Sequence, residues 1–141
     1  MSKSLAVIVY TDWGARGNPG PAWLWVYICT QNGVPIERRY KYLGETTNNV
    51  AEYTGGLMGI ELAIGLGATE IELRADSKLM IEQLAGRFKI KSPHLKVIYS
   101  QIQTLLTNYS GVIRFTHIPR EHNIEADRLS NIAMDEGMGR H

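Results

Sequence analysis

The chain has 141 residues, of which 44% are hydrophobic, and its 15 basic and 14 acidic side chains leave a formal net charge of +1. This size and composition predict one folded domain with a single core and exclude an intrinsically disordered chain. The balanced charge also excludes a strongly basic domain that binds nucleic acid through bulk electrostatics.

Signals for secretion or membrane insertion are not found in the sequence. No apolar run approaches the roughly 20 residues that a membrane-spanning helix needs. The N-terminal stretch lacks the small-residue cleavage site of a signal peptide. The single cysteine, Cys29, cannot form an internal disulfide and favours a reducing compartment. We therefore expect a cytoplasmic protein.

The first third of the chain predicts three antiparallel strands. They are expected at Leu5–Thr11, at Trp23–Gln31 and from Val34 onward. The first run is apolar and rich in β-branched residues, which is typical of a central strand. The Asn32-Gly33 pair predicts a tight hairpin turn between the second and third strands.

The rest of the chain predicts helices that alternate with strands. The expected elements are helices at Asn49–Leu66, Lys78–Leu84 and Ser92–Thr107, strands at Glu70–Ala75 and Val112–His117, and a C-terminal helix from Glu121 or Asn123 to about Glu136. Hairpins require antiparallel strands and crossovers require parallel ones. The order therefore predicts an α/β fold with a mixed five-stranded sheet and helices on both faces, in which the first three strands are antiparallel and strands one, four and five are parallel.

Four carboxylates are expected to gather at one edge of this sheet. Asp12 follows the first strand and Asp76 the fourth, and parallel neighbours share their carboxyl edge. Glu52 and Asp127 fall in the first turns of two helices that begin near the same edge. Each acid also has a structural alternative: a capping box from Asn49 to Glu52, turn capping by Asp12, or a favourable charge near a helix N-terminus.

Taken together, the four acids favour a metal site over four separate structural roles. Carboxylates so close together repel one another and raise one another's pKa. A cluster that stays ionised needs divalent cations, and an all-oxygen ligand set suits Mg²⁺ or Mn²⁺. Two such ions bridged by carboxylates form a clamp for phosphodiester cleavage.

Four motifs in chain order carry a family resemblance. They are T-D-x-G-x-x-G-N-P-G-P-A at Thr11–Ala22, T-N-N-V-A-E-Y at Thr47–Tyr53, A-D-S-K at Ala75–Lys78 and H-I-P-R-E-x-N-x-E-A-D-x-L-S-N at His117–Asn131. Position 13 departs from the first motif's usual glycine. From about Val7 to Met134 the chain resembles type 1 ribonuclease H, in the short bacterial and archaeal-like branch without a basic protrusion. The resemblance implies a single ribonuclease H domain over residues 1–141, with a core at about 5–136 and a short C-terminal tail.

The resemblance also implies an enzyme and its chemistry. The family's catalytic acids correspond to Asp12, Glu52, Asp76 and Asp127, which are expected to bind two Mg²⁺ ions, or Mn²⁺ in their place. The implied activity is metal-dependent endonucleolytic hydrolysis of the RNA strand of an RNA/DNA hybrid, which gives 5′-phosphate and 3′-hydroxyl ends.

Further residues are implied to contact the substrate or assist the reaction. Three asparagines match positions that contact the hybrid's minor groove, where amides sense the 2′-hydroxyl; they are Asn18, Asn48 and Asn49. Turn geometry and helix capping are alternative roles for the first and the last of them. Lys89 and Lys91 are expected to bind the substrate weakly in place of the missing basic protrusion. Arg120 or His122 is an auxiliary candidate for product release, because the family's mobile histidine has no clear counterpart here; His117 is expected to be an ordinary strand residue.

All three tryptophans occupy positions that are usually glycine in this family: Trp13, Trp23 and Trp25. Glycine in a strand often marks the close approach of a backbone or ligand. An indole beside Asp12 is thus expected to displace the metal site, block the hybrid or offer a stacking surface. Each of the three insertions into a packed sheet is expected to cost about 1–3 kcal/mol if nothing compensates.

Two alternatives to the nuclease stay open. One is a catalytically impaired nucleic-acid-binding module with the same fold, and the other is a relative that cuts a different structured nucleic acid. In all three cases the expected partner is nucleic acid, the RNA/DNA hybrid first. No membrane or obligate protein partner is expected, and the absence of a long apolar surface stripe favours a monomer.

Overall fold

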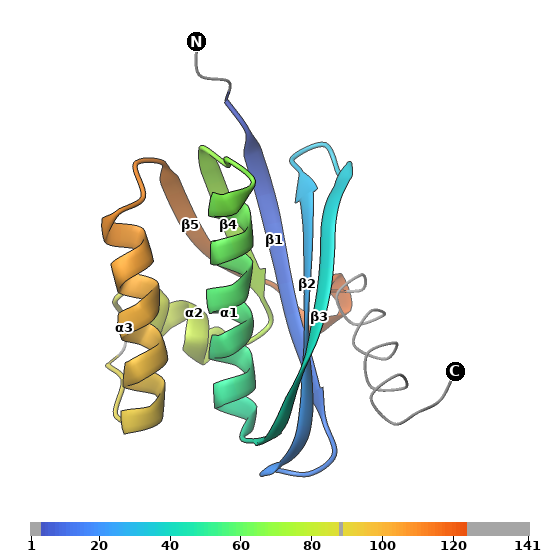
Figure 1. Ribbon diagram of the computed structural model, residues 1–141, viewed down its shortest axis with the longest axis vertical. Helices are drawn as coiled ribbons and strands as arrows, with labels where there is room; N and C mark the ends of the chain where they lie inside the picture. Colours follow the sequence, from blue (N-terminus) through green and yellow to red (C-terminus); the bar gives the residue numbers. More distant parts are fainter. Residues whose placement is uncertain (1–3, 88, 124–141) are drawn as a thin grey trace.

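The protein folds around one mixed five-stranded sheet (Figure 1). The structure, a computed structural model, describes residues 4–87 and 89–123. Its elements are β1 (Ala6–Ala15), β2 (Gly20–Thr30), β3 (Pro35–Thr46), α1 (Asn48–Gly65), β4 (Glu70–Ala75), α2 (Lys78–Leu84), α3 (Pro93–Thr107), β5 (Val112–His117) and a 3₁₀ turn, η1 (Arg120–His122). The strand order is β3-β2-β1-β4-β5, with β1, β4 and β5 parallel and β1, β2 and β3 antiparallel. The predicted sheet is confirmed.

The first hairpin is longer than its sequence indicates. The antiparallel ladder pairs Asp12 with Trp25 and continues to the pair Ala15 and Ala22. Strand β1 therefore runs past Thr11, and the prediction that Asp12 ends its strand is wrong. Cross-strand pairing, which local composition does not reveal, extends both strands and shortens the loop between them.

Helix α1 begins one residue earlier than predicted. The cap is Thr47, whose hydroxyl accepts a hydrogen bond from the Val50 N–H at 3.3 Å. The alternative of a capping box from Asn49 to Glu52 is therefore wrong, and the Glu52 side chain is available for another role. Arg120–His122 form the 3₁₀ turn η1, and the rest of the predicted C-terminal helix, from residue 124 onward, lies outside the described residues.

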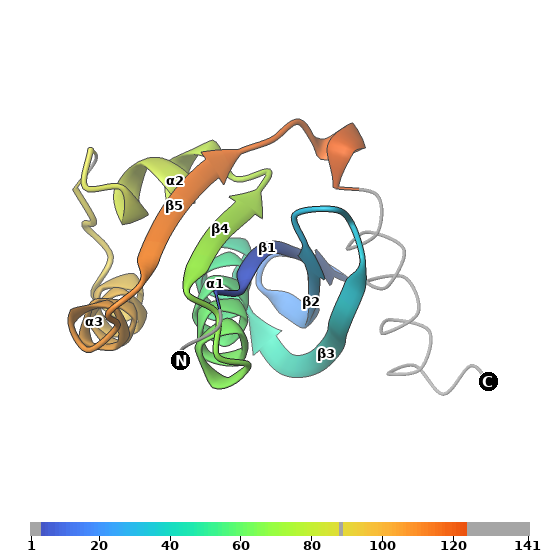
Figure 2. The same cartoon turned by 90° about the horizontal axis from the view of Figure 1, so that it is seen from above.

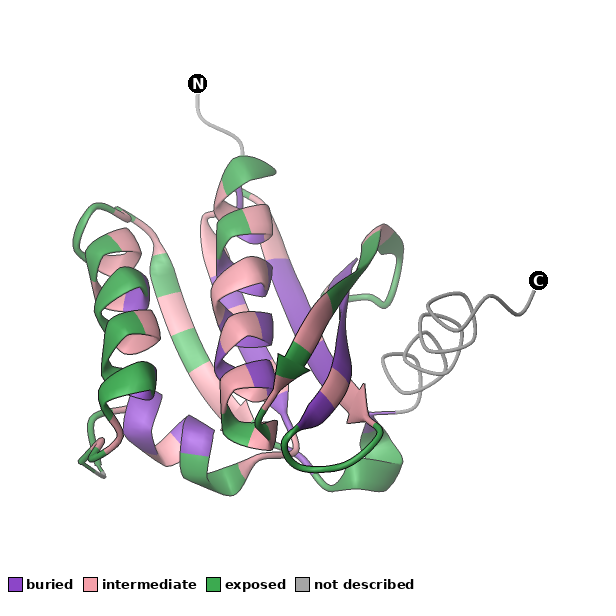
Figure 3. Cartoon of the chain, turned by 60° about the horizontal axis from the view of Figure 1, so that its bottom comes forward, coloured by how far each residue is buried: buried purple, intermediate pink, exposed green. Residues whose placement is uncertain are grey.

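Helices α1 and α3 lie side by side on one face of the sheet (Figures 1 and 2). Helix α1 approaches β1 closely at Gly59, where a Cβ atom would stand only 2.7 Å from Val9 Cγ1. The side chains between helix and sheet are fully buried, among them Leu24, Leu73 and Ile60. Figure 3 shows this gradient, with buried residues in the sheet and along the inner side of α1, and mostly exposed residues on α3. No helix in the described part of the chain is long and apolar enough to cross a membrane.

Aromatic and charged side chains form a network on the opposite face of the sheet. Tyr10 stacks on Tyr27 with ring centroids 5.9 Å apart, and the Arg74 guanidinium lies 5.6 Å from the Tyr10 ring. Arg74 Nε donates to Glu72 Oε2 at 3.0 Å, and Arg114 Nη2 lies 3.9 Å from Glu72 Oε1. The hydrogen bonds from Arg74 hold the pKa of Glu72 below its usual value.

We expect the substitution Glu72→Gln to destabilise the protein only when the carboxylate would be ionised. A lowered pKa in the folded state contributes stability above the unfolded-state value of 4.5, and that contribution is lost as the pH falls through the folded-state pKa. At pH 7 the variant should lose about 1 kcal/mol of unfolding free energy. Urea titrations from pH 3 to 7 test this, with the exposed Glu61→Gln as control; an equal loss at every pH would contradict it.

Candidate active site

Three of the four predicted acids line one small cavity, although they come from three separate elements. Asp12 lies in β1, Glu52 in the first turns of α1, and Asp76 directly after β4. The cavity is lined by these acids together with Thr11, Trp13, Gly55, Ala75, Ser77 and Met80. The fourth acid, Asp127, lies outside the described residues. We call this cavity the acid site.

Hydrogen bonds and burial act on the carboxylates of the acid site. Asp12 is only 8% exposed, and its Oδ1 accepts the Trp13 backbone N–H at 2.8 Å. Burial raises the pKa of Glu52, and the nearby Asp76 raises it further. Hydrogen bonds from Ser77 and Trp13 act in the opposite direction because they stabilise the carboxylate. The site thus holds acidic groups that a positive charge would stabilise.

The donor atoms of the acid site suit a hard divalent cation, but the space there is small. Carboxylate oxygens are the ligands that Mg²⁺ prefers. The cavity measures about 10 Å³, which is room for about one water molecule. Among the described residues, no three Asp, Glu, His or Cys side chains are close enough together to hold a metal ion. The carboxylate oxygens are thus suitable ligands for a divalent ion, but the cavity beside Trp13 is too small for an ion with several bound waters.

The Trp13 indole is one of the side chains that line this small cavity. Its Nε1 donates to Glu52 Oε1 at 2.9 Å, and its ring packs against the main core. No feature of the sequence pointed to this hydrogen bond, which joins residues 39 positions apart. The structure places this indole beside the acids, and the three outcomes expected for it stay predictions.

The other two tryptophans are buried in the sheet. Trp25 is fully buried opposite Asp12, and Trp23 packs on Tyr42 with ring centroids 5.0 Å apart. Within the described part of the chain, neither indole N–H has a hydrogen-bond acceptor. Both rings contribute apolar burial and leave a polar group unsatisfied.

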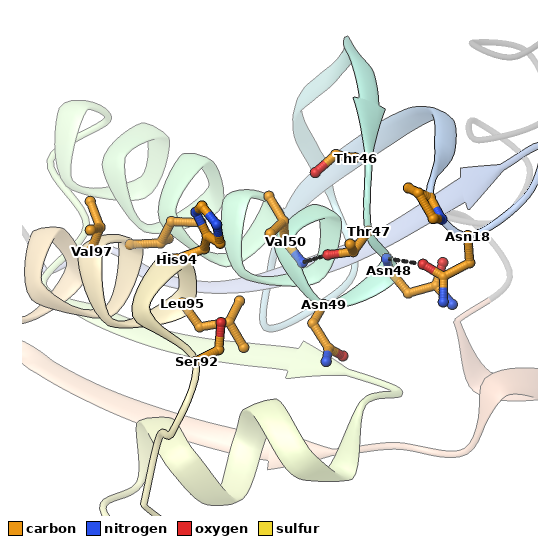
Figure 4. Close-up of a pocket in the computed structure, with 12 residues that line it drawn as sticks. Asn18, Thr46, Thr47, Asn48, Asn49, Val50, Ser92, His94, Leu95 and Val97 are labelled. Carbon is orange, nitrogen blue, oxygen red and sulfur yellow. Dashed lines mark hydrogen bonds between the residues drawn. The ribbon is translucent and has the colours of Figure 1, made fainter.

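An open groove of about 800 Å³ contains the three predicted asparagines (Figure 4). Asn18 comes from the β1–β2 loop, while Asn48 and Asn49 begin α1. Asn18 Oδ1 accepts the Asn48 backbone N–H at 3.2 Å, so the loop and the helix are joined at the groove. The opposite wall is the start of α3, with His94 and Val97 among its residues. We call this the asparagine groove.

The remaining predicted residues lie elsewhere. Lys89 and Lys91 are exposed and do not line the asparagine groove; the Lys89 carbonyl accepts a hydrogen bond from Gln83 Nε2 at 3.1 Å. Arg120 and His122 are exposed in η1. His117 lies in β5, as its sequence context predicts. Of all these residues, none lines the acid site or the groove.

Sequence reasoning missed two residues near the sites. Asn123 is fully buried, and its Nδ2 donates to the Thr11 carbonyl at 2.9 Å, which anchors the end of η1 to β1 beside Asp12. His94 lines the asparagine groove at the start of α3. Asn123 belongs to the fourth motif, but its sequence context indicated only a helix start; a histidine in the first turn of a helix gave no signal that sequence alone distinguishes from a surface role.

The strand order and the placement of the acids at the junction of β1, β4 and α1 define a ribonuclease H-like domain. A family model described as "Reverse transcriptase-like" matches residues 12–133. A bifunctional protein of Mycobacterium tuberculosis is 42% identical over 93% of this chain, which covers 36% of that protein.

Two solved structures are also similar. The N-terminal ribonuclease H domain of a Mycobacterium tuberculosis protein matches with a TM-score of 0.89 and 41% identity, over 96% of this chain and 98% of that one. The LC11 ribonuclease H1, solved in complex with an RNA/DNA hybrid, matches with a TM-score of 0.88 and 40% identity, over 94% and 99% of the two chains. The chain belongs to the reverse transcriptase-like family and, within it, to the type 1 ribonucleases H. It spans about a third of the length of the first curated relatives that it matches.

Proposed function

We propose that this domain is a metal-dependent endonuclease that hydrolyses the RNA strand of RNA/DNA hybrids. The observation that carries the proposal is the convergence of Asp12, Glu52 and Asp76 from β1, α1 and the end of β4 on one cavity. A similar ribonuclease H1 has been solved with an RNA/DNA hybrid, which supports the choice of substrate.

Asp12, Glu52, Asp76 and Asp127 would hold divalent ions, Mg²⁺ first and Mn²⁺ as a substitute. Bound in pairs, such ions supply an activated water and stabilise the leaving 3′ oxygen, which yields 5′-phosphate and 3′-hydroxyl ends. The chain itself keeps the carboxylates in place: the Trp13 backbone N–H holds Asp12, and Ser77 holds Glu52. Burial of Asp12 strengthens its interaction with any cation because water screens it less.

The asparagine groove would select the hybrid. An RNA-containing helix presents 2′-hydroxyls in a wide, shallow minor groove, and side-chain amides both donate to and accept from such groups. Asn18, Asn48 and Asn49 place three amides along one groove, joined by the hydrogen bond between the first two. This arrangement supports discrimination of RNA from DNA by direct contact.

The substitution Asn18→Ala should weaken hybrid binding with little effect on the chemical step. It removes one amide from the groove and the acceptor for the Asn48 N–H. A lost hydrogen bond of this kind corresponds to a rise in KM of about five- to tenfold with kcat nearly unchanged. Steady-state cleavage of a labelled hybrid measures both constants, with the exposed Gln31→Ala as matched control. An unchanged KM would exclude Asn18 from substrate binding.

A catalytically impaired binding module is the second candidate function, because the Trp13 indole donates to a carboxylate of the acid site. A module of this kind would bind the hybrid without cutting it. A panel of labelled RNA/DNA hybrid, double-stranded RNA and branched DNA, incubated with Mg²⁺, separates the candidates. The proposal expects cleavage of the RNA strand of the hybrid alone; binding without cleavage would favour the module, and cleavage of another substrate would favour a relative with different specificity.

We further propose that the domain acts as a monomer in the cytoplasm. The single cysteine, Cys29, is buried in the sheet, and a buried thiol needs no oxidising compartment.

A further inference from the structure

We propose that Trp13 sets the affinity of the acid site for divalent ions, because its indole occupies Glu52 Oε1 and lines the small cavity between the acids. The inference rests on the proposed metal site and concerns a residue that stands outside the family's usual pattern. Trp13 is thus an affinity-determining residue rather than a metal ligand.

The hydrogen bonds of Trp13 occupy one oxygen of each of two carboxylates in the acid site. The backbone N–H donates to Asp12 Oδ1 at 2.8 Å, and the indole Nε1 donates to Glu52 Oε1 at 2.9 Å. One residue therefore holds two carboxylates that come from different elements. A glycine at this position would keep the first of these hydrogen bonds and lose the second.

The small volume of the cavity beside the indole also indicates that Trp13 weakens ion binding. The cavity between the three acids measures about 10 Å³, whereas Mg²⁺ usually keeps several of its waters when it binds to protein carboxylates. Trp13 and Glu52 both line the cavity, so a movement of the indole would enlarge it.

The hydrogen bond from Trp13 to Glu52 lowers the affinity of the acid site for a divalent ion. A hydrogen bond to a charged group is among the stronger ones in proteins. An ion that binds Glu52 Oε1 must displace the indole N–H, and an indole that moves aside loses part of its packing against the core. We therefore expect weaker Mg²⁺ binding than the same acids would provide without the indole.

Isothermal titration with Mg²⁺ tests the proposal in the full chain. The variants are Trp13→Phe, which keeps a ring but removes the indole N–H, and Trp13→Gly, which removes the side chain. Both should bind Mg²⁺ more tightly than the native protein, by about tenfold or more for Trp13→Gly. Trp23→Phe is the matched control, because the Trp23 indole packs on Tyr42 away from the acid site and should leave the affinity unchanged.

The three indole N–H resonances supply a second measurement that does not depend on activity. Phe substitutions at positions 13 and 23 assign them, since the chain has three tryptophans. During a Mg²⁺ titration the Trp13 resonance should shift, and the Trp23 resonance should stay in place. Equal or weaker Mg²⁺ binding in both Trp13 variants would overturn the role of Trp13 while the metal site itself stands. No Mg²⁺ binding in any folded variant would overturn this inference and the proposed metal site together.

Discussion

The substitution Asp12→Asn should reduce the rate of RNA-strand cleavage by at least about 100-fold. Asp12 lies in the central strand β1, is only 8% exposed and lines the acid site with Glu52 and Asp76. The amide keeps the size of the side chain and removes its charge, so the fold should persist while the cation loses a buried anionic ligand. Single-turnover cleavage of a labelled hybrid, with Mg²⁺ in excess, measures the effect.

The matched control for this prediction is Glu61→Gln, which removes one carboxylate from the exposed side of α1. It changes the net charge by the same amount and does not line the acid site. We expect its cleavage rate to equal that of the native protein. If Asp12→Asn cleaved the hybrid as fast as Glu61→Gln, the acid site would not be the centre of the reaction.

The substitution Trp25→Ala should lower the free energy of unfolding by about 3–5 kcal/mol. Trp25 is fully buried between Asp12 of β1 and Tyr40 of β3, so truncation leaves a cavity in the middle of the sheet. Urea unfolding followed by circular dichroism gives the free energy by linear extrapolation. A loss below about 1 kcal/mol would show that the ring contributes little to packing at this position.

A Trp25→Phe variant separates the ring from its polar group. Phenylalanine keeps most of the apolar volume and removes an indole N–H that has no acceptor among the described residues. An unsatisfied buried donor costs about 1–3 kcal/mol, so its removal should offset much of the lost packing. We therefore expect Trp25→Phe to be clearly more stable than Trp25→Ala and within about 1.5 kcal/mol of the native protein.

The elements with strong local signals were predicted closely from the sequence. Strand β4 and helix α2 have the predicted bounds, and Ser77 caps α2 by accepting the Met80 N–H at 3.2 Å. Helix α1 ends near the predicted glycines, with Gly67 at a φ of 84°, a conformation that glycine adopts readily. The parallel and antiparallel pairings followed from the order of these elements because crossovers and hairpins each permit one orientation.

The features that depend on contacts between distant residues were not predicted. The part of the β1–β2 ladder beyond Thr11 depends on pairing with a partner strand. The N-cap of α1 is Thr47 rather than Asn49, and the sequence could not distinguish them because threonine and asparagine are both favoured N-caps. The convergence of three acids was expected from the strand ends, although Asp12 proved to lie within a longer strand. The hydrogen bond from Trp13 to Glu52 was not foreseen, since an indole's direction is set by packing rather than by sequence spacing.

The most direct test of the proposed function uses a hybrid whose RNA strand carries a 5′ label. With Mg²⁺, we expect the native domain to cut the RNA strand into fragments with 3′-hydroxyl ends and new 5′-phosphates, to leave the DNA strand intact, and to stop when the divalent ions are chelated. Intact RNA after incubation with folded protein that demonstrably binds the hybrid would contradict the proposal.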